Sequence, residues 1–200
     1  MHLRIFLCGL FLLPALAAAH NPEKASPDEG ARGLRNVTVL IIRHAEKPFS
    51  EIGLSDQGEQ RAAAYATYFN PFRLGKETLQ PQRLIATSDS ESSERPRLTL
   101  MPLAARLQLP LEQPFFDKDY GELVDSLRKS NQAGVVLIAW HHGHIDDLID
   151  AFGGDSQKIL GRTIWPEDVY NWVVVLRFDH SGQLIPSRSR RVQEHLLPGD

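Results

Sequence analysis

The sequence predicts an α/β fold, a three-layer sandwich in which helices flank a mainly parallel central sheet. Two aliphatic runs, at 37–42 and 134–140, contain no charged residue, which is typical of strands buried on both faces. Segments with helical spacing of apolar residues alternate with these and other strands, as in parallel α/β sheets. Both runs are followed by basic or imidazole side chains, at the sheet edge where such folds bind ligands.

The amino terminus has the pattern of a secretory signal peptide over residues 1–19. Arg4 precedes a short apolar run that contains Pro14 and ends in three alanines, so we expect cleavage and no stable membrane insertion afterwards. An uncleaved anchor is the alternative. Residues 20–36 are rich in proline, glycine and charge, which predicts a flexible lead-in to a single domain over 37–200. A periplasmic or secreted location follows from this pattern.

Composition and charge exclude several classes of protein. The 200-residue chain is 42% hydrophobic and 24% charged, with a net charge of −3 that becomes −4 once Arg4 is removed. No basic excess indicates nucleic acid or an anionic membrane as a partner. The one cysteine, Cys8, lies in the signal peptide, so the mature chain has no disulfide, thiolate nucleophile or cysteine metal site.

A helix is predicted after the first strand and a loop. Ser55 or Asp56 is suited to its N-cap, and Glu59 is placed for a capping box with Asp56. Apolar residues at helical spacing continue to about Phe69, and Pro71 prevents the helix from going further.

The middle of the chain predicts a second short strand at 83–87. A helix then begins near Pro96 and continues to Leu107, with Pro102 expected to kink or interrupt it. Residues 111–116 predict a weaker strand at a sheet edge, because two prolines lie in or beside it.

The second half repeats the alternation of helix and strand. It predicts a helix at 119–129, the buried strand 134–140, a helix at 145–152 closed by two glycines, a last buried strand at 172–178 and an edge hairpin from Leu184 onward.

Four cationic or imidazole side chains follow strands of this predicted sheet. Arg43 and His44 come after the first strand, His142 after the strand at 134–140, and Arg95 at a helix start after the short strand. Since the carboxyl ends of parallel strands meet at one edge, these four residues are expected to converge. Two guanidinium groups and two imidazoles are suited to binding a tetrahedral dianion such as phosphate.

Four motifs lie in order along the chain. They are RHAEKP at 43–48, GLSDQGEQRA at 53–62, SSERPRLTLMPLA at 92–104 and VLIAWHHGH at 136–144. They resemble motifs of the histidine phosphatase superfamily, which includes the phosphoglycerate mutases. The segment from Trp165 to Tyr170 is similar to the tail of bacterial secreted members.

The resemblance selects between neighbouring candidates. In the family a functional arginine is followed four positions later by threonine, which selects Arg95, with Thr99, over Arg97. The functional histidine directly precedes glycine, which selects His142 over His141. His141 is then expected to be a packing residue, and His144 a residue at the rim of the site.

The resemblance also implies a metal-independent phosphomonoester hydrolase that needs no cofactor. His44 would attack phosphorus and form a phosphohistidine that water hydrolyses. Arg43, Arg95 and His142 would bind the phosphate oxygens, while Lys47 either contacts the substrate or is solvated. We expect the two guanidinium groups to hold the pKa of His44 at or below about 6.5.

The proton donor is predicted from the same resemblance. Phytase-like relatives carry Asp after the second histidine, where this chain has Gly143. Mutase-like relatives carry Glu three residues before a Tyr-Gly pair, and Asp117 stands three residues before Tyr120. Asp117 is therefore the predicted donor. Its rivals are Glu46, Glu51 and Asp146.

Two other functions fit parts of the sequence. His142, His144 and Asp146 have the spacing of a zinc hydrolase site, although such a site needs further histidines downstream. A non-catalytic phosphate-binding module on the same fold is the other alternative. We favour hydrolysis of a small phosphorylated substrate over both, and over mutase transfer. The sequence indicates neither the substrate nor the oligomeric state.

Overall fold

The computed structural model describes residues 33–50, 52–130 and 134–200. The predicted signal peptide and residues 20–32 of the predicted lead-in lie outside the described residues. Leu34 belongs to that lead-in but is only 2% exposed, so the packed part of the chain starts ahead of residue 37. In chain order the helices and strands are β1 (Thr38–Arg43), α1 (Asp56–Tyr68), β2 (Phe72–Leu74), β3 (Glu77–Leu79), β4 (Pro81–Ala86), α2 (Arg95–Leu107), β5 (Leu111–Glu112), α3 (Tyr120–Lys129), β6 (Val135–Trp140), a 3₁₀ turn (His142–His144), α4 (Ile145–Ala151), α5 (Ser156–Leu160), β7 (Trp172–Arg177), a second 3₁₀ turn (Pro186–Arg188) and β8 (Arg190–Gln193).

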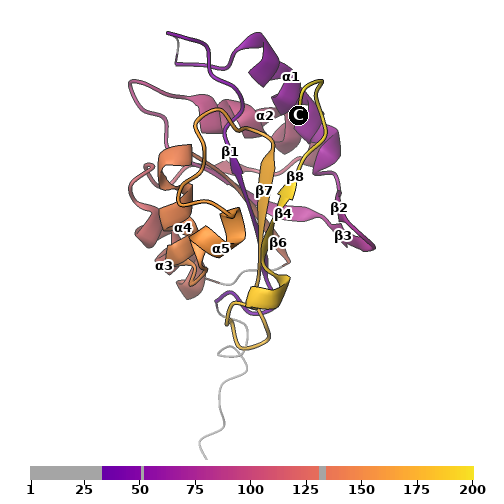
Figure 1. Cartoon of the computed structure of the whole chain (residues 1–200), viewed down its shortest axis with the longest axis vertical. Helices are drawn as coiled ribbons and strands as arrows, with labels where there is room; N and C mark the ends of the chain where they lie inside the picture. Colours follow the sequence, from indigo (N-terminus) through magenta and orange to yellow (C-terminus); the bar gives the residue numbers. More distant parts are fainter. Residues whose placement is uncertain (1–32, 51, 131–133) are drawn as a thin grey trace, which may run out of the picture.

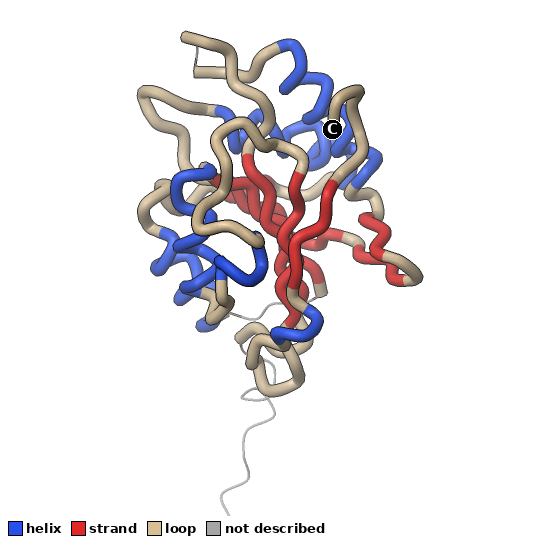
Figure 2. The backbone as a smooth tube through the Cα atoms, viewed as in Figure 1, coloured by secondary structure: helices blue, strands red, loops and turns tan. Residues whose placement is uncertain are grey.

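A six-stranded sheet in the order β5-β4-β6-β1-β7-β8 forms the middle layer (Figure 1). β5, β4, β6 and β1 run parallel, β7 runs antiparallel to β1, and β8 runs antiparallel to β7. Helices α1 and α2 cover one face of the sheet, and α3, α4 and α5 cover the other (Figure 2). The predicted three-layer α/β sandwich with a mainly parallel sheet is confirmed.

Strand β1 lies inside the sheet, and all six of its residues are buried. Val39 and Ile41 pack in the cluster that contains the side chains of α3 and α4, whereas Leu40 and Ile42 pack with those of α1 and α2. Successive strand residues point to opposite faces, so a strand covered by helices on both sides needs an unbroken aliphatic run. This requirement explains the composition of the segment.

The register of β1 against β6 determines what meets at the carboxyl edge. The two strands are parallel, and Arg43 lies opposite Trp140. The residues that follow them, at positions 44 and 141, therefore leave the sheet at the same level.

Helix α1 begins after Ser55, whose side-chain oxygen accepts a hydrogen bond from the Gly58 backbone N–H at 3.2 Å. This identifies Ser55 as the N-cap and makes Asp56 the first helical residue. The predicted capping box between Asp56 and Glu59 is therefore wrong, because the cap lies one residue earlier.

Helix α2 passes through Pro102 without interruption, so the expected break is not found. A proline inside a helix costs about 3 kcal/mol through the lost hydrogen bond and the ring clash. Leu100 and Leu103 of the same helix are fully buried, and each such side chain contributes roughly 1.5–3 kcal/mol on burial. Packing of this face outweighs the local cost.

The remaining differences between the predicted and the observed secondary structure concern short helices and strands. The predicted edge strand at 111–116 is at the edge but spans only Leu111–Glu112. The β2–β3 hairpin and α5 were not predicted, since segments of three to five residues carry no usable periodicity. Within the described residues, no helix has the length and apolar character needed to cross a membrane.

The contact between α1 and the loop after β1 leaves no room for a side chain at Gly58. A Cβ there would overlap the carbonyl oxygen of Glu46 and lie 3.0 Å from its backbone nitrogen. Gly58→Ala is expected to lower the free energy of unfolding by about 1–3 kcal/mol, measured by urea denaturation. Gly121→Ala is the matched control, because nothing lies within 4 Å of its added methyl group. Equal stability of the two variants would contradict the close approach.

Candidate active site

A cavity of about 420 Å³ opens at the carboxyl edge of β1, β4 and β6. Its walls come from the loop after β1, the serine-rich loop before α2, the segment before α3 and the 3₁₀ turn after β6. Five of the six predicted site residues line it: His44, Lys47, Arg95, Asp117 and His142. The sixth, Arg43, is buried beside His44.

One ring nitrogen of His44 is hydrogen-bonded: Nδ1 lies 2.7 Å from the carbonyl oxygen of Ala45. The backbone N–H of His44 donates to the carbonyl oxygen of Trp140 at 3.0 Å. A carbonyl only accepts, so Nδ1 carries the proton and Nε2 keeps its lone pair. The ring is therefore held in the tautomer that a nucleophilic Nε2 requires.

The pKa of His44 lies well below its usual value of 6.5. Burial is the largest cause, the hydrogen bond to Ala45 opposes it, and the neighbouring His141, Arg43 and Arg95 lower the pKa further. The expected direction agrees with the structure, but we expected the guanidinium groups to be the main cause. Desolvation of a side chain that is 2% exposed is the larger effect.

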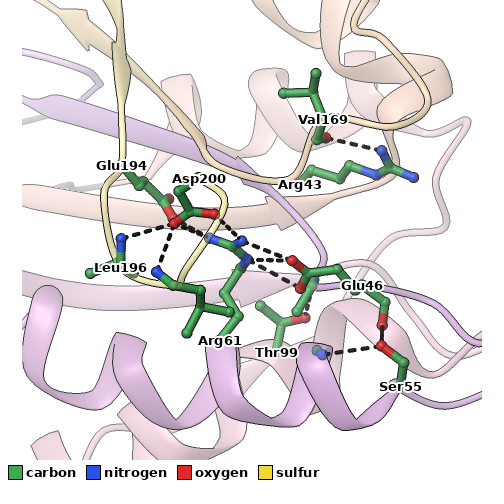
Figure 3. Close-up of polar contacts among 12 residues, drawn as sticks. Arg43, Glu46, Ser55, Arg61, Thr99, Val169, Glu194, Leu196 and Asp200 are labelled. Carbon is green, nitrogen blue, oxygen red and sulfur yellow. Dashed lines mark hydrogen bonds and ion pairs between the residues drawn. The ribbon is translucent and has the colours of Figure 1, made fainter.

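Arg43 is fully buried and is held from one side. Its Nη1 donates to the carbonyl oxygen of Val169 at 3.0 Å (Figure 3). The same nitrogen donates to the carbonyl oxygens of Pro166 at 3.4 Å and Glu167. Its guanidinium carbon lies 3.7 Å from the ring centroid of Tyr170. Burial lowers its pKa to about 10, so it stays charged at neutral pH. Nε and Nη2 are buried and have no hydrogen-bond partner among the described residues, which leaves the two-nitrogen edge of the guanidinium for an oxyanion.

Arg95 is the first residue of α2 and lines the cavity, whereas Arg97 does not. Arg97 forms ion pairs of 2.7 Å with Asp89 and with Glu94. Thr99 ties the helix to the loop after β1: its hydroxyl accepts from the Ala45 N–H at 2.8 Å and donates to the Arg95 carbonyl at 2.8 Å.

Both adjacent histidines after β6 line the cavity, but only His141 contacts His44. The ring centroids of His141 and His44 are 5.1 Å apart in an edge contact. Burial lowers the pKa of His141 to about 4. The motif predicts that His141 is a packing residue, whereas the structure places it in the cavity wall with its ring against His44. The signal was present in the two strand ends, because the register of Arg43 with Trp140 places residue 141 beside residue 44.

Asp117 is the one candidate proton donor that lines the cavity in the described part of the chain. Its side chain is 40% exposed, and its backbone carbonyl accepts from the Trp140 indole at 3.0 Å. Glu46 is buried and paired with Arg61 at 2.8 Å. Burial raises the pKa of Asp146, which lies outside the cavity wall. Glu51 lies outside the described residues.

Lys47 lines the cavity and is paired with a carboxylate. Its ammonium group forms an ion pair of 2.9 Å with Glu167, and both side chains are exposed.

The residues of the zinc alternative have other partners or lie apart. His144 forms a hydrogen bond through Nδ1 with Asp147 at 3.0 Å. Across the described ranges, no three His, Cys, Asp or Glu side chains gather in a way that could hold a metal ion. His142, His144 and Asp146 thus do not form the ligand set that the zinc alternative needs.

Comparison with known proteins gives the fold a wider context. No protein family model and no curated protein matches the sequence. Among solved structures, the chain is similar to a phosphoserine phosphatase from Entamoeba histolytica, crystallised with 3-phosphoglyceric acid, at a TM-score of 0.52 and 14% identity over 80% of this chain and 100% of that one. The chain has the same fold as this phosphatase.

A phosphoglycerate mutase from Plasmodium falciparum is similar to the same extent. Its TM-score is 0.51 at 14% identity, over 82% of this chain and 95% of the mutase. The fold implied by the sequence motifs is therefore confirmed by two enzymes with different activities.

The lowered pKa values of His44 and His141 affect stability in mild acid. In the unfolded chain an imidazole takes up a proton near pH 6.5, whereas the folded protein keeps His141 neutral down to about pH 4. The unfolded state then binds more protons in this window, so the free energy of unfolding decreases as the pH falls. His141→Gln should reduce the decrease between about pH 7 and about pH 5 by about 2 kcal/mol in urea denaturation.

The control for this experiment is His180→Gln, since His180 is exposed in a turn. It should show the pH dependence of the unchanged protein. If His141→Gln shows that same dependence, His141 is not held neutral by burial.

Proposed function

We propose that this protein is a phosphomonoester hydrolase that works through a phosphohistidine on His44, without a metal or other cofactor. The observation that carries the proposal is the buried His44 ring, with Nδ1 bonded to the Ala45 carbonyl and Nε2 left as a nucleophile in a cationic cavity. The substrate is a small phosphorylated molecule. The periplasmic or secreted location predicted from residues 1–19 stays a prediction.

The first step transfers the phosphoryl group to the protein. Nε2 of His44 attacks phosphorus, the N–P bond forms, and the bond between phosphorus and the leaving oxygen breaks. Nε and Nη2 of Arg43 and the guanidinium of Arg95 bind the nonbridging oxygens, and Lys47 supports them at the mouth of the cavity. Asp117 gives its proton to the leaving oxygen.

The second step restores the protein. Water attacks the phosphohistidine and Asp117 takes up its proton, so the N–P bond breaks and phosphate leaves. Arg43 and Arg95 stabilise the charge in both steps, because their guanidinium groups are held in place beside His44 before the reaction begins.

His141 and His142 are both candidates for the imidazole that contacts the transferred phosphoryl group. The motif assigns the phosphate contact to His142, whose Nδ1 is buried without a partner in the described part of the chain. The ring contact with His44 favours His141 as the imidazole nearest to the transferred group. We propose that both line the phosphate pocket and that His141 contributes more to the transfer.

The nucleophile assignment predicts the loss of all turnover in His44→Ala. The measurement is release of nitrophenol from 4-nitrophenyl phosphate by the purified protein, with His180→Ala as the matched control. Vanadate should inhibit the unchanged protein and a chelator should not. Turnover by His44→Ala would contradict the assignment. Binding of inorganic phosphate by the unchanged protein without any turnover would support the non-catalytic alternative.

The two histidine assignments predict different kinetics. His141→Gln should lower kcat by about 10²-fold or more, as expected when a donor to the transferred group is removed. His142→Gln should lower kcat less and raise KM more. The same nitrophenyl phosphate assay measures both variants. If His142→Gln lowers kcat more than His141→Gln does, His142 is the imidazole that contributes more to the transfer.

A further inference from the structure

His144 is held in one orientation at the cavity wall. Its Nδ1 lies 3.0 Å from Oδ2 of Asp147, and its ring stacks on Tyr120 with the centroids 5.8 Å apart. Its other nitrogen, Nε2, lies 4.0 Å from Oδ2 of Asp117. Three elements therefore meet at this imidazole: the segment before α3, the 3₁₀ turn and α4, which lies beside α3 (Figure 1).

The hydrogen bond to Asp147 determines which atom faces Asp117. A carboxylate accepts, so Nδ1 carries a proton and Nε2 is the nitrogen that gains or loses the second one. A 4.0 Å separation is longer than a hydrogen bond, but catalytic contacts often tighten only when substrate is bound. Since His144 is held by Asp147 and Tyr120, the approach falls to the Asp117 side chain, which is 40% exposed.

We propose that His144 is a positioning residue for the proton donor, and that Asp117 and His144 hold one transferable proton between them. This inference rests on the proposed phosphatase function. Asp147 accepts a hydrogen bond from Nδ1 and so leaves Nε2 as the nitrogen that exchanges a proton with Asp117. The imidazolium can then supply the proton that Asp117 delivers to the leaving oxygen.

The proton balance of the cycle is complete within the pair. Before transfer, the pair holds one proton, on Nε2 of His144 or on the Asp117 carboxyl. When the bond between phosphorus and the leaving oxygen breaks, Asp117 delivers that proton to the leaving oxygen, and the pair becomes a carboxylate and a neutral imidazole. The attacking water then returns a proton to the pair as phosphate is formed.

Other titratable groups face this pair. His141 and His142 come from the same turn, Tyr120 covers one face of the His144 ring, and Asp147 holds its Nδ1. Asp117 raises the pKa of His141 against the larger effect of burial, which shows that the carboxylate lies among the imidazoles. His141 itself has a pKa of about 4, so it does not compete for the shared proton near neutral pH.

The test compares a leaving group that needs protonation with one that does not. The substrates are glycerol phosphate and 4-nitrophenyl phosphate, and the readout is the ratio of their kcat values between about pH 5 and about pH 8. General acid catalysis is worth roughly 10²–10⁴-fold, so Asp117→Asn should lower the ratio by about 10²-fold at every pH. His144→Gln should lower it by about tenfold above about pH 6.5 and by less at about pH 5.

Asp147→Asn provides an independent variant, because it leaves His144 in place and removes the negative charge beside its Nδ1. In Asp147→Asn the ratio of kcat values should begin to fall at a lower pH than in the unchanged protein, as it should in His144→Gln. His180→Gln, in an exposed turn, is the matched control and should follow the unchanged protein.

Two outcomes would overturn the proposal. One is a ratio in His144→Gln that equals that of the unchanged protein at all pH values. The other is an equal loss at every pH, which a merely structural role would produce. Failure of the proposed function is a separate result: the unchanged protein would then release no nitrophenol, or His44→Ala would release as much.

Discussion

The anchoring of residues 44–46 is the constraint on which the rest of the site depends. The His44 N–H donates to the Trp140 carbonyl of β6, and the Ala45 N–H donates to the Thr99 hydroxyl of α2. The Glu46 carboxylate accepts from Arg61 of α1 at 2.8–3.1 Å (Figure 3). The sheet and both helices of one layer thus each bind one residue of the loop. Since these contacts are buried, the loop cannot move without breaking hydrogen bonds, which is costly in the protein interior.

The ion pair that holds Glu46 belongs to a larger buried cluster. Arg61, whose side chain is 2% exposed, also binds Glu194 and Asp200. Burial raises the pKa of Glu194 to about 8, so this carboxyl keeps its proton at neutral pH and excess negative charge is avoided. Removing one partner from such a cluster typically costs about 3–5 kcal/mol. The cavity has the opposite balance, because Arg95 lines it beside two neutral imidazoles, His44 and His141, and the buried Arg43 lies next to His44.

Much of the fold follows from local pattern, and the exceptions have physical causes. The buried strands β1 and β6 and a helix cap at Ser55 or Asp56 are visible in the sequence, because burial on both faces and helix capping each require particular residue types. The choice of Ser55 comes from the structure. The passage of α2 through Pro102 is not, since the burial of Leu100 and Leu103 comes from partners distant in sequence. The ring contact between His141 and His44 is not visible in the motifs either, because motif comparison uses neighbours along the chain and not the residue across the sheet.

The sequence by itself determined the layers, the strand end that precedes His44, the helix start near Arg95 and the cationic character of their meeting point. It did so because side-chain periodicity and strand burial are properties of short segments. Only the tertiary structure decided that His141 contacts His44, that Arg43 turns one edge of its guanidinium to the carbonyls of residues 166–169, and that His144 faces Asp117. These three depend on strand register and on loops packed from distant parts of the chain, and no local pattern encodes them.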